Sequence, residues 1–377
     1  MKIGIITQPL HTNYGGLLQN YALQQVLTRL GHEVYTINKN TLGIYSAPWD
    51  KRIKFRTKQN IKKIIGRPYM PSYKEWLYTK QHCARFVEQN IKTTPMFKTQ
   101  NELNAIIEKC NFDAYVAGSD QVWRPGYSQN IYNDFLDFCQ EKTGIKRVAY
   151  AASFGVDNWE FNEEETKKCS ELAKLFNAIS VREDSGMHLC KEHMGVEAIH
   201  VLDPTMLLEK EDYIELVNKV NEKPSNGNLF CYILDNSEAI QKAIIGIEQK
   251  EELKSFMVKA KNAKLTFAKN EKIEDHVIPP PTKWLRAFMD AKMVFTDSFH
   301  GCVFSIIFNK PFWVIGNKER GNARFDSLLK VFNLECRRVD INDIDNIDFT
   351  APIDWDEVNT VKKEWQEKSI TFIKENL

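Results

Sequence analysis

A histidine with polar neighbours follows an apolar run in the last third of the chain. The run at 293–297 is typical of a buried strand, and His300 then opens a segment with apolar residues at helical spacing. The positive end of a helix dipole disfavours the imidazolium form, whereas a bound anion favours it. His300 is therefore a candidate proton donor that works with an anionic substrate, or else a structural histidine that braces the turn.

An arginine stands at the end of another apolar run. Arg182 directly follows the strand predicted at Ala178–Val181, so we expect it at the edge of a cleft. Its planar guanidinium suits a carboxylate or a phosphate. The alternative is a salt bridge with Glu183 or another local acid.

Three further cations follow the strand predicted at Pro311–Ile315. They are Lys318, Arg320 and Arg324. Together they could clamp a phosphate, although a solvated surface cluster is the more common explanation of such a run.

A glycine-containing loop precedes the first predicted helix. Asn13, Gly15 and Gly16 stand where the backbone could approach a ligand closely and where exposed N–H groups favour an anion. A tight structural turn explains the same residues equally well.

The elements that must position these residues alternate between strand and helix. Residues 2–7 and 33–38 read as strands on either side of an amphipathic helix, which is a βαβ beginning. After an irregular stretch from about 41 to 95 the alternation resumes, and the polar segment 221–228 is the predicted linker. The sequence thus predicts an α/β protein with Rossmann-like domains at 1–220 and 228–350 and a C-terminal helix at 355–376. The segment 237–261 between the first two strands of the second domain is expected to be mainly helical.

The bulk composition excludes several classes of protein. The 377 residues suffice for two domains, 43% of them are hydrophobic, and a net charge of +1 indicates no nucleic-acid partner. The eight cysteines stand singly, so we expect reduced thiols in the cytoplasm and no metal site. The N-terminal apolar run is too short for a signal peptide, and no stretch reaches the length of a membrane span.

One segment has a strong local charge. Between Lys51 and Arg67 eight cations are interleaved with isoleucines and no acid interrupts them. This pattern resembles an element that lies on an anionic membrane surface. The alternative is a helix that is basic for solubility, or one whose cations pair with acids elsewhere in the fold.

Six segments, in this order, resemble the polysaccharide pyruvyl transferase family. They are NYGGLLQNYALQ, AYVAGSDQVW, YAASFG, ISVRE, LDPTMLL and TDSFHGCVFSIIFNKPFWVIG. The resemblance extends from residue 1 to about 335, and the order and spacing of the segments make it specific.

The resemblance implies a fold and a reaction. The fold would be glycosyltransferase-B-like, with the acceptor on the N-terminal domain and the donor on the C-terminal domain. The donor would be phosphoenolpyruvate, a co-substrate that needs no further cofactor. The acceptor would be a sugar, expected on a lipid-linked precursor of an exopolysaccharide or capsule. The product would be a cyclic pyruvate ketal bridging two hydroxyls, released with phosphate.

The resemblance also assigns roles to particular residues. The family's acid histidine corresponds to His300, its strand-end arginine to Arg182, and a basic residue that helps to hold the donor to Arg320. We therefore assign His300 as general acid and the two arginines as donor clamps. Further donor-side candidates are Ser298, Gly301, Lys318 and Arg324.

The chain departs from the family pattern at two places. Ser298 stands where the family has an arginine two positions before the histidine, and Lys318 or Arg324 could replace that charge. The glycine-rich loop of many members is Gly118-Ser119-Asp120 here.

The acceptor side has fewer candidates. Asp120 is a candidate general base or acceptor contact, with capping of its own loop as the alternative. Trp123 could stack on a sugar ring, or it is an ordinary buried tryptophan. The glycine-containing loop supplies the remaining acceptor candidates, Asn13, Gly15 and Gly16.

Two other functions remain open at this point. A nucleotide-sugar glycosyltransferase shares the two-domain architecture. A non-catalytic glycan-binding protein is the alternative outside enzymes, but it leaves the cations at successive strand ends unexplained.

Overall fold

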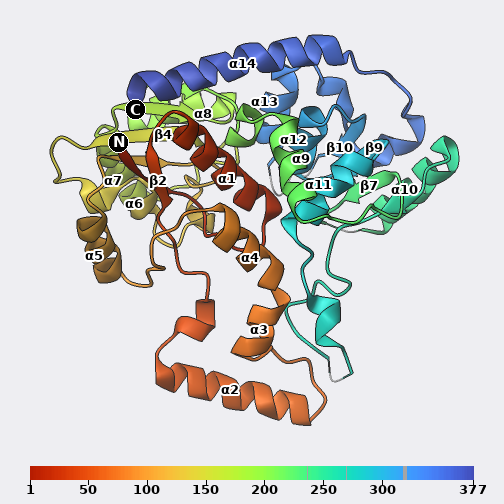
Figure 1. Cartoon of the computed structure of the whole chain (residues 1–377), viewed down its shortest axis with the longest axis horizontal. Helices are drawn as coiled ribbons and strands as arrows, with labels where there is room; N and C mark the ends of the chain where they lie inside the picture. Colours follow the sequence, from red (N-terminus) through yellow and green to blue (C-terminus); the bar gives the residue numbers. More distant parts are fainter. Residues whose placement is uncertain (236, 269, 317–320) are drawn as a thin grey trace.

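The structure, a computed structural model, describes residues 1–235, 237–268, 270–316 and 321–377. Two parallel β-sheets with flanking helices form two α/β units, and a long helix returns across both of them (Figure 1). The alternation of strands and helices along the sequence predicted this class of fold.

The first sheet belongs to the N-terminal half. Within the described residues it has six parallel strands in the order β2-β1-β3-β4-β5-β6. Their bounds are β1 (Lys2–Ile6), β2 (Glu33–Thr36), β3 (Ala114–Ala117), β4 (Lys146–Ala152), β5 (Ala178–Val181) and β6 (Ile199–His200). Every residue of β3 is buried, as expected for a parallel strand covered on both faces.

The second sheet repeats the same topology. In the described part of the C-terminal half it has five strands in the order β11-β10-β9-β7-β8. Their bounds are β7 (Leu229–Tyr232), β8 (Ser255–Phe256), β9 (Met293–Thr296), β10 (Phe312–Ile315) and β11 (Arg338–Val339). The strand order reverses between β1 and β3 and again between β7 and β9. Ligands of open parallel sheets bind at such reversals, at the carboxyl ends of the strands.

Helices connect and cover the strands. In the N-terminal half they are α1 (Tyr14–Arg29), α2 (Trp49–Ile64), α3 (Tyr73–Thr79), α4 (Gln81–Asn90), α5 (Gln100–Cys110), α6 (Ile131–Asp134), α7 (Glu163–Ala173), α8 (Asp184–Leu189) and α9 (Lys210–Lys219). Those that follow are α10 (Glu238–Glu251), α11 (Pro281–Asp290), α12 (Phe299–Ile307), α13 (Ala323–Val331) and α14 (Trp355–Asn376). None of the helices in the described ranges has both the length and the apolar character to cross a bilayer.

One sequence expectation about these elements is wrong. The stretch expected to be irregular from 41 to 95 contains α2, α3 and α4. The apolar residues of α2 are exposed and give the helix no face toward the core, and the capping box of Ser72 and Glu75 that starts α3 was overlooked. The segment 237–261 is mainly helical, as expected, but its helix ends at Glu251. The two-residue strand β8 that follows is too short to show a period in the sequence.

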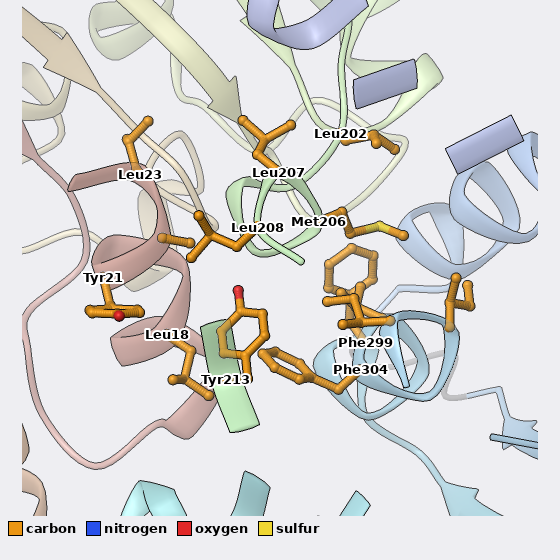
Figure 2. Close-up of a cluster of buried hydrophobic side chains, with 14 of the residues drawn as sticks. Leu18, Tyr21, Leu23, Leu202, Met206, Leu207, Leu208, Tyr213, Phe299 and Phe304 are labelled. Atoms are coloured by element: carbon orange, nitrogen blue, oxygen red, sulfur yellow. The ribbon is translucent and has the colours of Figure 1, made fainter. Parts of the chain in front are cut away.

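A single apolar core joins the two sheets. Helices α1, α9 and α12 and the short 3-10 helix η5 (Pro204–Leu207) meet in it, as Figure 2 shows. The rings of Tyr213 and Phe304 lie edge to face with centroids 4.9 Å apart, and both side chains are fully buried. Because this core draws residues from both halves, we expect them to behave as one rigid unit.

The C-terminal helix strengthens that connection. Helix α14 leaves the second sheet and packs on the first domain: Gln366 donates to the carbonyl of Met206 at 2.7 Å, and Leu202 N–H donates to Ser369 Oγ at 3.1 Å. Met206 and Leu202 flank Asp203, so α14 buttresses a loop that reaches the cleft.

Candidate active site

The candidate active site lies where the carboxyl ends of the two sheets meet. His300 follows β9, Arg182 follows β5, Asp120 follows β3, and Gly15 lies in the first turn of α1, directly after β1. These positions include the reversal points of both sheets. The structure thus assembles the site from distant parts of the chain.

The imidazole of His300 is wedged between the domains. The residue is 6% exposed, and a β-carbon on Gly15 would overlap its Nδ1 atom, so the ring lies directly on the first turn of α1. His300 itself stands in the first turn of α12. The N-termini of two helices, one from each domain, therefore converge on this ring, and their partial positive charges favour an anionic ligand.

The Nε2 atom of His300 is buried and has no hydrogen-bond partner among the described residues. Oδ2 of Asp203 lies 3.6 Å from it, which is longer than a hydrogen bond. The Asp203 carboxylate therefore places a negative charge beside Nε2 without accepting a hydrogen bond from it. Asp203 was not predicted as a site residue; the signal in the sequence was an acid directly after a predicted strand, inside the LDPTMLL segment.

Asp203 is itself held rigidly. Its Oδ2 accepts from Nη1 of Arg182 at 2.9 Å, and its Oδ1 accepts from the backbone N–H and the hydroxyl of Thr205 at 3.0 and 2.7 Å. Burial tends to raise the pKa of Asp203, but His300, Arg182 and Thr205 together hold that pKa well below its usual range. Asp203 is thus a permanent negative charge beside the histidine.

Arg182 braces several acids at once. Its Nη2 lies 3.3 Å from Oδ1 of Asp120, and its Nε lies 4.0 Å from a carboxylate oxygen of Glu183. Burial tends to lower the pKa of Arg182, but Asp120, Asp203 and Glu183 more than offset this and raise it. Because its nitrogen atoms face protein carboxylates and the residue is almost fully buried, this geometry favours the salt-bridge interpretation over a direct clamp on a donor.

Glu183 connects Arg182 to a neighbouring loop. Its Oε1 accepts from the backbone N–H groups of Phe154 and Gly155 at 2.7 and 3.1 Å. Gly155 in turn packs against Gly321 of the C-terminal half. A β-carbon added to Gly321 would lie 2.7 Å from the Gly155 carbonyl oxygen. Lys318 and Arg320, two of the predicted donor contacts, lie outside the described residues.

Arg324 is the predicted donor contact that the structure does describe. Its guanidinium carbon lies 5.7 Å from the centre of the Phe299 ring, and that of Arg182 lies 4.4 Å from the same ring. Burial, followed by the nearby charge of Arg182, lowers the pKa of Arg324 to about 10. Arg324 is therefore charged at neutral pH.

Ser298 and Gly301 lie at the start of α12 with different roles. Ser298 is the N-cap residue, but its hydroxyl does not cap the helix; its N–H donates to Thr296 Oγ1 at 3.1 Å. A β-carbon on Gly301 would overlap that same Oγ1 atom. Gly301 thus allows α12 to start close to β9, which is a packing role.

The glycine-containing loop is also partly structural. The side chain of Asn13 caps α1 by accepting from Gly16 N–H at 3.3 Å, and Gly15 makes room for His300. The glycines predicted a close approach of the backbone to a ligand, and the group that approaches Gly15 in the structure is the catalytic candidate His300 from the other domain.

Trp123 belongs to the core of the N-terminal domain. Its indole is fully buried, stacks on Phe135 with centroids 4.7 Å apart, and donates to the carbonyl of Asp134 at 3.2 Å. The protein therefore occupies the surface that a sugar would need. This placement supports the buried-tryptophan alternative over sugar stacking.

A pocket of about 390 Å³ lies between Tyr14 and the end of β7. Thr12 and Tyr14 form one wall, Tyr232 and Leu234 form another, and residues of the segments 257–267 and 276–278 close it. Leu234 N–H donates to Asp297 at 2.7 Å, so this wall is tied to the loop that carries His300. In the described ranges, no group of three or more His, Cys, Asp and Glu residues is arranged to hold a metal ion.

The fold is that of known two-domain sugar enzymes. The UDP-GlcNAc 2-epimerase of Methanocaldococcus jannaschii superposes with a TM-score of 0.52 at 12% identity, covering 99% of this chain and 100% of that one. The UDP-GlcNAc 2-epimerase of Neisseria meningitidis gives 0.53 at 10%, covering 100% and 99%. An Arabidopsis thaliana protein, UGT89C1, whose structure holds UDP-L-rhamnose, gives 0.51 at 8%, covering 98% of each chain. At these identities the likeness establishes a glycosyltransferase-B fold and nothing about substrate.

The sequence defines the family within that fold. The profile of the polysaccharide pyruvyl transferase family matches residues 13–319, which is most of the chain. No curated protein matches the chain by sequence. The chain belongs to the polysaccharide pyruvyl transferase family, as the order of its motifs predicted.

The contact between Gly15 and His300 predicts opposite effects for two neighbouring substitutions. Gly15→Ala should lower the free energy of unfolding by about 1–3 kcal/mol, because the new methyl group overlaps the imidazole. Gly16→Ala should leave it unchanged or raise it by up to about 1 kcal/mol, because alanine favours the helix and its nearest neighbour would lie 3.4 Å away. Urea unfolding of both variants checks this. Equal effects would mean that the ring does not rest on Gly15.

The charge of Asp203 predicts a pH dependence of stability. Its pKa is lower in the folded protein than in the unfolded chain, so its contribution is complete above about pH 4 and is lost as the pH falls below that value. The stability difference between wild type and Asp203→Asn should therefore shrink on acidification. Urea unfolding from neutral to acid pH measures it, with Glu171→Gln at an exposed position as control. A pH-independent difference would contradict the assignment.

Proposed function

We propose that this protein transfers the pyruvyl group of phosphoenolpyruvate onto two hydroxyls of a sugar, forming a cyclic ketal and releasing phosphate. The observation that carries the proposal is the buried, unpartnered Nε2 of His300 between two helix N-termini, with Asp203 beside it. A proton donor, a fixed negative charge to sustain it and a positive field for an anion are what this reaction requires.

The donor carries a carboxylate and a phosphate, so it must meet positive charge. The N-termini of α1 and α12 supply part of it, and Arg324 supplies a buried cation. We keep Arg320 and Lys318 as proposed donor contacts. Ser298 occupies the position where the family has an arginine, and its hydroxyl offers a neutral hydrogen bond instead.

The reaction then follows from the positions of these groups. Nε2 of His300 gives its proton to the methylene carbon, which becomes a methyl group, and positive charge develops on the adjoining carbon. One sugar hydroxyl attacks that carbon and loses its proton to a base, for which Asp120 is the proposed group. The carbon–oxygen bond to phosphate breaks with its electron pair on the phosphate as the second hydroxyl attacks the same carbon, and the proton of that hydroxyl goes to the phosphate. The proton taken up by the base then returns through solvent to His300, which restores both groups.

Asp203 and Arg182 act through His300 and Asp120 in this scheme. Asp203 holds a negative charge 3.6 Å from Nε2 of His300, beside the proposed acid. Arg182 forms salt bridges with both Asp120 and Asp203 and so holds the two carboxylates in place. They are positioning residues.

We propose that the acceptor sugar enters the pocket of about 390 Å³ beside Tyr14 and Leu234. Its aromatic and aliphatic walls suit the faces of sugar rings. A lipid-linked polysaccharide precursor is the proposed acceptor, and the cytoplasm at the inner membrane face is the proposed location, because such a precursor is anchored there.

Replacing the acid should abolish turnover without unfolding the protein. His300→Asn should slow phosphate release from phosphoenolpyruvate by about 10²–10⁴-fold, since the contribution of a general acid has this size. Donor affinity measured by calorimetry should change little. His188→Asn, at an exposed position on α8, is the control.

The same assays can refute the proposal. Near-normal turnover by His300→Asn would remove this residue from the mechanism. Thermal protection by a nucleotide sugar in place of phosphoenolpyruvate would instead favour a glycosyltransferase.

The acceptor pocket can be tested separately from the donor. Ala263 lines the pocket from an exposed position, so a larger side chain fills the space without disturbing the core. Ala263→Trp should raise KM for the acceptor and leave KM for phosphoenolpyruvate unchanged, whereas Ala263→Ser should behave as wild type. An unchanged acceptor KM in the tryptophan variant would exclude this pocket.

A further inference from the structure

Helix α2 stands apart from both sheets, at the edge of the molecule opposite α14 (Figure 1). Gln59 is the one residue of the helix that is buried, whereas Trp49 is 74% and Ile64 is 77% exposed. A helix in a soluble domain normally hides its apolar side chains against a core. An exposed patch of large apolar side chains marks an interaction surface.

The apolar residues of α2 form a stripe. At 3.6 residues per turn Ile53, Ile61 and Ile64 lie within about 80° of one another, and Trp49 adjoins them. All four are exposed. The stripe lies on the side of the helix away from Gln59. The Oε1 atom of Gln59 accepts a hydrogen bond from Met70 N–H, which fixes that side of the helix to the protein.

Cations flank the stripe on both sides. One flank has Lys51, Lys54, Lys58 and Lys62, and the other has Arg52, Arg56 and Lys63. In the part of the chain that the structure describes, none of these cations forms a salt bridge with an acid of the protein. The net charge of the chain is only +1, so this positive surface is local. Among the described residues, these cations are therefore not paired with acids elsewhere in the fold.

A pocket adjoins the second flank. Arg52, Arg56 and Lys63 line a space of about 560 Å³, together with tyrosines of the segments at 45 and 69–73. The one acid in its wall, Glu75, accepts from Ser72 N–H at 2.7 Å and caps α3. Three cations and phenolic hydroxyls around an open space suit a phosphate group.

We propose that α2 docks the protein on a membrane surface of anionic phospholipids. The apolar stripe enters the boundary between headgroups and acyl chains, the lysine flank meets the headgroups, and the pocket takes a lipid phosphate. Nucleic acid would meet the charge but leave Trp49 and the isoleucines without a partner. A second copy of the chain would bring like charges together on both sides of the stripe.

The pocket beside α2 adjoins the proposed acceptor pocket. Met70 and Pro71 line both the pocket beside α2 and the pocket beside Tyr14, so the two spaces share a wall. Tyr69 and Phe267 exchange backbone hydrogen bonds at 3.0 and 2.8 Å, which ties this segment to the C-terminal half. If the acceptor is lipid-linked, a point that rests on the proposed function, docking brings the acceptor pocket to the bilayer that carries it.

Vesicle sedimentation tests the docking directly. Wild type should sediment with vesicles of phosphatidylglycerol and phosphatidylcholine at low salt, be released at high salt, and ignore pure phosphatidylcholine. Changing Lys51, Lys54, Lys58 and Lys62 to glutamine should weaken binding at least about tenfold, since each cation near an anionic surface contributes. The substitutions Trp49→Ser, Ile61→Ser and Ile64→Ser together should weaken binding at low salt although every cation is kept, because they remove the apolar contact.

Matched variants and a soluble assay complete the test. Glutamine at four exposed lysines outside α2, namely Lys109, Lys167, Lys174 and Lys363, removes the same charge and should leave vesicle binding unchanged. Equal sedimentation of wild type and both α2 variants, or none by wild type, would overturn the proposal, as would α2 substitutions that change only self-association. Phosphate release with a water-soluble acceptor should be the same in the lysine variant and wild type. That assay reports on the proposed reaction alone, so failure of docking and failure of the reaction give different results.

Discussion

The buried guanidinium of Arg182 holds the cleft together. It joins Asp120 from the loop after β3, Asp203 from the loop after β6 and its neighbour Glu183. Burying a charge away from water costs several kcal/mol unless the charge is paired. Removing any one of these groups would therefore leave its partners buried without a counter-charge and would destabilise the fold. The loops of the N-terminal sheet are consequently fixed relative to one another before any substrate arrives.

The second domain contacts this cluster of Arg182 and its acids at two points. The Phe299 ring lies over the Arg182 guanidinium, and the His300 imidazole rests on Gly15 within reach of the Asp203 charge. The position of the His300 imidazole depends on both domains, because a displacement of either would separate the ring from Asp203 or from α1. The large apolar core below it, which Figure 2 shows, makes such a displacement costly. The proposed proton donation and the domain packing would therefore depend on the same few contacts.

Helices α2 and α3 project beyond the two sheets (Figure 1). The exposed isoleucines of α2 would weaken solubility unless a partner covers them. The proposed contact with the bilayer would therefore lie at the projecting helix, away from the proposed chemistry at the strand ends.

Much of this could be predicted from the sequence alone. The apolar runs at β1, β3, β5 and β9 gave the parallel strands, because a strand buried on both faces must be continuously apolar. Polar residues directly after those runs identified His300, Arg182 and Asp120, since strand ends of parallel sheets face ligands. The order of the motifs gave the family, and the run of cations at 51–67 gave the basic segment.

Tertiary structure decided the rest. Which acid lies beside His300, that Arg182 faces carboxylates, that Gly15 makes room for an imidazole and that Trp123 is sealed in the core all depend on contacts between residues far apart in the chain. Local periodicity carries no information about such contacts, because it reports which face of an element is apolar and not what covers that face. For the same reason the sequence alone determined that α2 is basic and apolar, whereas only the folded chain decided that both kinds of side chain face outward.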